Sequence, residues 1–213
     1  MSGPALARPR LRGASHVVAV PVAAGACLAL AVRARTGAQL AAAVAYGITM
    51  VVMFAVSAAY HRGQWSAPIR RRLKAVDHTT IFCFVVGSYA PLAVLVLGPL
   101  GRLLFLGSLA AVVVLGIVIK LRTLDRPGGP ADVLYAIAAW WGLLIVGPAL
   151  RVLSPVDLAL ALAGLLFYSL SGGCLAGRWY DPAPRTFGYH EVAHALALAG
   201  TACHYALYWR GYR

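Results

Sequence analysis

The sequence predicts an all-α fold, an integral membrane bundle of seven transmembrane helices, and three observations support this prediction. Of the 213 residues, 61% are hydrophobic and only 12% are charged, whereas soluble globular domains have about 25% charged residues. The mean hydropathy is +0.78, which also excludes a disordered chain. The apolar residues gather into seven stretches with short linkers between them.

Each of the seven stretches meets or approaches the length of a membrane helix, about 20 apolar residues for a hydrocarbon core of about 30 Å. They cover residues 17–32, 39–60, 77–98, 103–120, 132–150, 156–177 and 188–209. Three linkers, TGAQ, DRPGGP and DPAPR, hold the Gly, Pro and Arg residues expected of short turns. What remains of the chain is too short for a soluble domain.

The first span is the shortest, and it follows Arg8, Arg10 and Arg12, so it also matches a cleavable signal peptide. Because six further hydrophobic spans come after it, we expect an uncleaved first helix instead. We expect residues 1–15 to form a mobile N-terminal tail and residues 16–213 to form the transmembrane domain.

The positive charge indicates membrane topology rather than nucleic-acid binding. The formal net charge is +13, and the basic residues lie between apolar runs instead of on one polar face. With a cytoplasmic N-terminus, thirteen of the 19 Lys and Arg residues fall on the cytoplasmic side and six on the other. Because cytoplasmic loops carry the excess of Lys and Arg, we expect the N-terminus inside and the C-terminus outside. The expected location is a bacterial plasma (inner) membrane, with membrane lipids as substrate or ligand.

Ionisable residues gather at the inner ends of three spans that are distant in sequence. Such groups are costly inside a membrane and usually mark a site, so their common depth predicts that they meet. They are Ser57 and His61 at the end of span 39–60, Asp77 and His78 at the start of span 77–98, and His190, Glu191 and His194 at the start of span 188–209.

The spacing of these residues predicts a zinc site. His190 and His194 project from one helix face at i and i+4, a spacing that can chelate a metal, and His61 can supply a third nitrogen. Three neutral imidazoles and a water are typical of catalytic zinc, which lowers the pKa of that water to about 7. Asp77 is then placed to act as a base or to orient the water, and Ser57 to hold a ligand or the water.

Each polar residue also has an ordinary structural interpretation. His16 and His204 are interpreted as interfacial or core histidines, and His78 as a helix-start residue or one behind the ligands. Asp77 alternatively offsets the helix macrodipole in a first turn. Ser57 alternatively bonds its own backbone at a helix contact.

The segment 190–194 reads His-Glu-Val-Ala-His and so also matches the H-E-x-x-H signature of metalloproteases, in which the Glu is the general base. No Asp or Glu follows Glu191 to act as a third ligand, and Gly200 stands where the extended form of the motif has its third His. A protease would need its third ligand from upstream.

Four segments together resemble the hemolysin III family, which is similar to the progestin and adipoQ receptors, including the adiponectin receptors. They are SAAYH at 57–61, KAVDHTTI at 74–81, GSYAP at 87–91 and HEVAH at 190–194. The resemblance covers nearly the whole chain. It implies zinc bound near the cytoplasmic side by His61, His190 and His194, with Asp77 hydrogen bonded to the zinc-bound water. Some similar eukaryotic proteins are ceramidases, which hydrolyse a lipid amide.

The sequence therefore leads us to expect a zinc-dependent hydrolase of a lipid amide or ester. The alternative from another class is a non-enzymatic sensor or membrane-homeostasis protein whose zinc is structural. An intramembrane H-E-x-x-H protease and a lytic pore are the two further alternatives.

Overall fold

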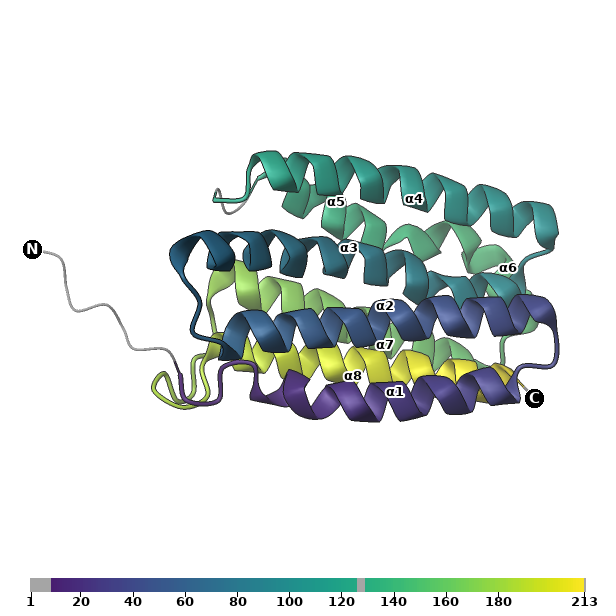
Figure 1. Ribbon diagram of the computed structural model, residues 1–213. Coiled ribbons are helices and arrows are strands. Elements are labelled where there is room, and N and C mark those ends of the chain that lie inside the picture. The colour runs from purple at the N-terminus through teal and green to yellow at the C-terminus, as the bar shows by residue number, and fades with distance from the viewer. Residues whose placement is uncertain (1–8, 126–128, 213) are drawn as a thin grey trace, which may run out of the picture.

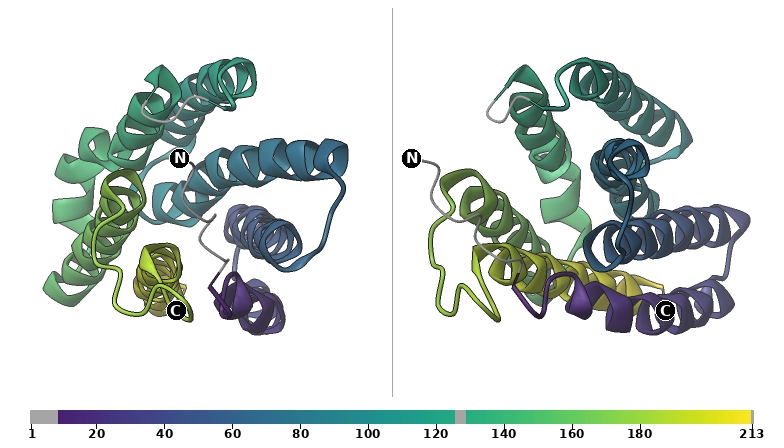
Figure 2. Two further views of the ribbon diagram at one scale, coloured as in Figure 1. Left: turned by 90° about the vertical axis from the view of Figure 1, so that its left-hand side faces the viewer. Right: turned by 60° about the vertical axis from the view of Figure 1, so that its left-hand side comes forward.

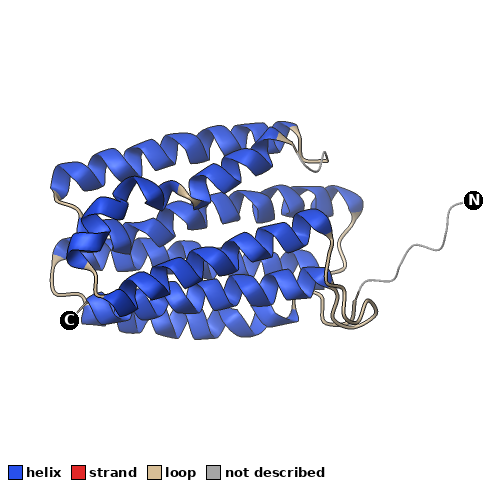
Figure 3. Cartoon of the chain, turned by 180° about the vertical axis from the view of Figure 1, so that it is seen from behind, coloured by secondary structure: helices blue, strands red, loops and turns tan. Residues whose placement is uncertain are grey.

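The computed structural model describes residues 9–125 and 129–212, which form a bundle of long helices (Figure 1). Within these ranges there is no strand (Figure 3). An isolated β-bridge joins Ala183 to Phe187 ahead of the last helix. The predicted all-α membrane fold is confirmed. The elements are α1 (Ala14–Arg33), α2 (Gly37–Arg62), α3 (Ala67–Val96), α4 (Pro99–Arg122), α5 (Pro130–Ala139), the 3-10 helix η1 (Trp141–Ile145), α6 (Val146–Val152), α7 (Pro155–Gly177) and α8 (Tyr189–Gly211).

Six segments of the described chain are long and apolar enough to cross a membrane. They are α1 to α4, the combination of α5, η1 and α6, and α7. The remaining helix, α8, has 23 residues, about 35 Å of helix, and packs against α7 and α1. Its length therefore suits a seventh span, but polar residues such as His190, Glu191 and His194 lower its hydropathy.

The third helix is longer than the span predicted at 77–98. α3 begins at Ala67, with Pro68 in its first turn, where a missing backbone N–H costs no helical hydrogen bond. Asp77 and His78 consequently lie about three turns inside the helix. The interpretation of Asp77 as a first-turn residue, and of His78 as a helix-start residue, is wrong.

The fifth span, predicted as one segment over 132–150, is interrupted. α5 stops at Ala139, and the 3-10 helix η1 separates it from α6. Tyr89 of α3 reaches the break: its hydroxyl donates to the carbonyl oxygen of Ala139 at 2.5 Å and accepts from the N–H of Gly142 at 3.0 Å. Side chains that satisfy freed backbone groups are what allow a helix to break inside a membrane.

The third helix occupies the middle of the bundle. In α3, 67% of the most apolar stretch is buried, against 17–44% in the other apolar spans. One hydrophobic cluster joins α3 to α1, α2 and α8, and a second joins it to α4, α5, η1 and α6. Figure 2 shows the α3 ribbon between these other helices. This central position puts α3 in contact with both α2 and α8.

Four helices begin at the end of the bundle where three others finish. In Figure 1, α1, α3, α5 and α8 start at the left, where α2, α4 and α7 end. We call this end the histidine end, because His61 lies in the last turn of α2 while His190 and His194 lie in the first turns of α8. It corresponds to the side that the Lys and Arg distribution predicts to be cytoplasmic.

Candidate metal centre

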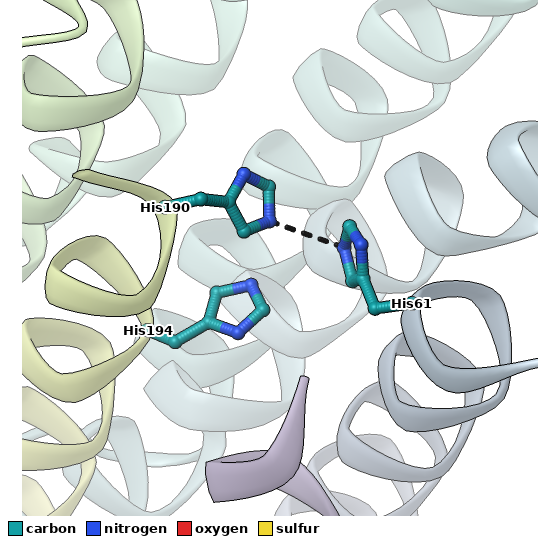
Figure 4. A group of neighbouring side chains, drawn as sticks. All are labelled: His61, His190 and His194. Atoms are coloured by element: carbon teal, nitrogen blue, oxygen red, sulfur yellow. Dashed lines mark hydrogen bonds between the residues drawn. The ribbon is translucent and has the colours of Figure 1, made fainter. Parts of the chain in front are cut away.

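Three histidines meet at the histidine end of the bundle. One ligand atom each from His61, His190 and His194 forms a group in which all atoms lie within 4.8 Å of one another. Figure 4 shows the His61 ring on one helix facing the other two rings across the gap to α8. The Nε2 atoms of His61 and His190 are 3.2 Å apart. Residues 129 positions apart in the chain thus share one small volume.

The arrangement of the three imidazoles fits a zinc ion. Nitrogen ligands about 2.0–2.1 Å from a tetrahedral zinc lie about 3.3 Å from one another, close to the 3.2 Å between His61 and His190. Without an ion, one of these two rings must present an N–H to the other; a cation would satisfy both lone pairs. Among the described residues the group contains three His, Cys, Asp or Glu side chains, so a four-coordinate ion held by them would have one further position for a water or a substrate.

Asp77 and Ser57 lie beside the histidines. Asp77 is 6% exposed, and its Oδ2 is 3.9 Å from Nε2 of His61. Ser57 is one turn before His61 on α2 and is also buried, near the Asp77 carboxyl group. The structure therefore brings all five sequence-predicted site residues together, from α2, α3 and α8.

His16 is a sixth member of this group, and sequence reasoning assigned it an ordinary role. It is 5% exposed, its Nδ1 is 2.8 Å from Oγ of Ser57, and its ring stacks on that of His194 with centroids 3.9 Å apart. His16 opens the first predicted span at the same inner level as the others. Sorting by depth, the criterion that selected the other residues, would also have selected it.

The other two histidines named from sequence lie outside the group. His78 is on the same helix as Asp77, but its charged neighbours are Lys120, Lys74 and Asp132. His204 packs against α7, where its Nε2 is 3.2 Å from the carbonyl oxygen of Ala161. That contact agrees with the interpretation of His204 as a core residue.

Both oxygens of Glu191 are engaged away from the imidazoles. Oε2 accepts a hydrogen bond of 2.9 Å from the N–H of Gly188, as in a helix-capping box. Oε1 lies 2.7 Å from Nε of Arg12. Glu191 is 3% exposed. Its contacts are those of a residue that fixes the start of α8, rather than of a carboxylate free to accept a proton.

The segment ahead of α1, residues 9–13, crosses the histidine end, and we call it the strap. The backbone N–H groups of Arg10 and Leu11 donate to the carbonyl oxygens of Arg185 and Thr186, each at 3.0 Å. Gly13 has a φ of 73°, and a Cβ on it would lie 2.7 Å from Cβ of His61. The strap therefore lies directly against a candidate ligand. Residues 1–8 of the expected N-terminal tail lie outside the described residues, whereas these contacts hold residues 9–13 in place.

Two apolar cavities lie farther along the bundle. The larger, about 170 Å³, is lined by residues of α3, η1, α6, α7 and α8, including Tyr89 and His204. The smaller, about 30 Å³, shares those two residues and reaches Phe84 and Tyr168. His204 is ten residues after His194, about 15 Å along α8. The cavities thus begin between the candidate metal centre and the opposite end of the bundle.

The chain is similar to a known protein family and to a curated bacterial protein. A family model described as haemolysin-III related matches residues 5–205. The Hemolysin-3 homolog of Bacillus subtilis (strain 168) is 26% identical over 160 residues, which are 74% of this chain and 70% of that relative. No solved structure matches the chain.

Proposed function

The chain belongs to the haemolysin-III-related family, and from that premise we propose that it is a zinc-dependent hydrolase of a lipid amide or ester. We place it in a bacterial inner membrane with the histidine end toward the cytoplasm, as the excess of Lys and Arg on that side favours. The observation that carries the proposal is the convergence of His61, His190 and His194 within 4.8 Å beside the buried Asp77.

The residues around the three imidazoles have the chemistry that hydrolysis requires. Zinc, when bound, would supply Lewis acidity and lower the pKa of a water to about 7. Asp77 would accept at Oδ2 the proton that an attacking water loses, and would return it to the departing amine or alcohol. The Ser57 hydroxyl, which lies near that carboxyl group, would hold it in one orientation. Asp77 would therefore end the reaction in the protonation state in which it began.

A lipid substrate is favoured by the surroundings of the site. The bundle is apolar over six spans, and the larger cavity offers about 170 Å³ between α7, α8 and the broken fifth span. An acyl chain would lie there without losing apolar contacts, because the lining is almost wholly hydrophobic. Its polar head would then be directed toward the histidine end.

A second candidate is a non-enzymatic membrane-homeostasis protein with a structural zinc. The observation that favours it is that the ligands come from α2 and α8, two helices far apart in the sequence, so a metal would fasten them together. The strap across this end also suits a closed site. In this case the metal would be needed for stability and lipid would not be consumed.

The experiment that separates the two candidates measures turnover and stability together. Purified protein in liposomes is incubated with an N-acyl lipid amide and with the matching acyl ester, before and after zinc removal. A hydrolase releases fatty acid from one of them in the wild type and in His78→Ala, a histidine outside the cluster, but not in His190→Ala. Intact lipid with a zinc-dependent melting temperature would instead identify the structural role.

A further inference from the structure

We infer that His16 is a positioning residue of this site: it orients the Ser57 hydroxyl toward Asp77 and braces the ring of His194. This inference deepens the proposed function and rests on it for the reaction that His16 would assist. The contacts themselves join α1 to α2 and α8. Sequence distance again hides the relationship, because Ser57 is 41 positions from His16.

The hydrogen bond to Ser57 has a direction that its neighbours determine. While Asp77 is ionised, its carboxylate can only accept hydrogen bonds, so a Ser57 hydroxyl bonded to it would donate its single proton there. Nδ1 of His16, 2.8 Å from the same Oγ, would then carry a proton and donate it to that oxygen. The order of donation is His16 to Ser57 to Asp77, and it fixes the carboxyl group beside His61.

The ring of His16 has a second contact that does not involve its nitrogens. It lies nearly parallel to the ring of His194, with an interplanar angle of 10° and ring centroids 3.9 Å apart. The ring of Phe54 also packs against it, with ring centroids 5.0 Å apart. A flat neighbour at this distance limits the rotation of the His194 ring about its side-chain bonds. His194 would keep its orientation toward the other two imidazoles through this stack.

The second ring nitrogen of His16, Nε2, is available for a hydrogen bond. It is buried and has no hydrogen-bond partner among the described residues, and in the tautomer deduced above this atom is an acceptor. A residue that only filled space would have no need of an imidazole at this point, because burying an unpaired polar atom is unfavourable. Nε2 would accept from a water or from a hydroxyl or amide N–H of the substrate.

Two substitutions separate the contacts of His16. His16→Phe keeps a flat ring against His194 but loses Nδ1, and His16→Asn keeps an N–H donor near the Nδ1 position but loses the stack. Because residues behind metal ligands change affinity or activity by about 10- to 100-fold, we expect kcat on the lipid probe to fall by that factor in His16→Phe, with KM and zinc content retained. His16→Asn should recover most of that kcat per bound zinc and bind zinc about 10-fold more weakly.

The kcat of a double variant distinguishes a shared hydrogen-bonded connection from simple packing by His16. Ser57→Ala and His16→Phe remove the same connection, so kcat of the double variant should match the lower single variant rather than the product of both losses. Additive losses would overturn the inference, as would wild-type kcat in His16→Phe. A His16→Phe protein that no longer binds zinc and no longer elutes at the wild-type volume in size-exclusion chromatography would also overturn the inference. This result would indicate that His16 has a purely structural role.

A metal spectrum keeps this test distinct from the proposed hydrolysis. In the cobalt-substituted protein, the visible absorption of the ion reports the geometry of its ligands and needs no substrate. We expect it to be altered in His16→Asn and unchanged in His16→Phe and in the control His78→Gln. If no lipid is turned over but this pattern appears, the proposed function fails while the bracing of His194 stands. An unaltered spectrum and unchanged zinc affinity in His16→Asn would overturn the bracing.

Discussion

Nε of Arg12 lies 2.7 Å from Oε1 of Glu191, and this ion pair ties the strap ahead of α1 to the first turn of α8. The side chain of Glu191 is 3% exposed and that of Arg12 is 19% exposed. Because the carboxylate is buried, its partner matters more than in a surface ion pair. The contact gives Glu191 of the H-E-x-x-H segment a role in assembling the histidine end.

Replacing Glu191 with Gln should cost stability and spare activity. A glutamine keeps an oxygen that can accept from the N–H of Gly188, but it leaves Arg12 without its ion pair. We expect a loss of about 1–3 kcal/mol in the free energy of unfolding, with lipid hydrolysis within about 3-fold of wild type. Thermal unfolding in detergent and the liposome assay measure the two quantities. Full stability combined with abolished turnover would instead identify Glu191 as the general base of the reaction.

The three candidate ligands should each be needed for metal. We expect about one zinc per chain in protein purified without chelator, and a content near zero in His61→Ala and His194→Ala. His78→Ala serves as the matched control, because His78 is not one of the three grouped ligands and its main charged neighbours are residues of α3 to α5. Elemental analysis of detergent-purified protein gives the result. Equal metal content in the ligand variants and the control would remove the basis of the proposed site.

Gly13 should tolerate no larger side chain. Its φ of 73° is strained for other residues, and an added Cβ would lie 2.7 Å from Cβ of His61. Gly13→Ala should therefore lower the free energy of unfolding by about 1–3 kcal/mol and release the strap to proteases. Gly25→Ala in α1 is the control, because a Cβ there meets nothing within 4 Å and alanine favours helix. Similar cleavage of the two variants would argue against close packing of the strap on His61.

Removing the Tyr89 hydroxyl should weaken the broken fifth span. This oxygen bonds both Ala139 and Gly142, so in Tyr89→Phe the carbonyl of one and the N–H of the other lose a buried partner. We expect destabilisation by about 1–3 kcal/mol and faster hydrogen exchange confined to residues 139–146. Mass spectrometry of exchanged peptides checks the location. Exchange that rises equally in α2 would indicate a global effect instead.

The membrane fold followed from the sequence because its cause is local. A span must be long and apolar wherever it lies, so composition predicted the number of helical segments, and all seven are present in the bundle. The limits of single helices were less predictable. α3 starts ten residues before the predicted span, because Ser66 and Pro68 can begin a helix outside the apolar region. The break after Ala139 depends on Tyr89, a residue 50 positions away.

The candidate site was partly predictable for the same reason. Position along a helix determines depth, and depth alone placed His61, Asp77 and His190 at one level. The sequence by itself thus determined which residues share the end of the bundle. Only the tertiary structure decided which of them face one another, since this depends on how helices rotate as they pack. In the packed bundle the ring of His16 stacks on that of His194, and Glu191 pairs with Arg12. His78 lies near charged residues of α4 and α5 instead.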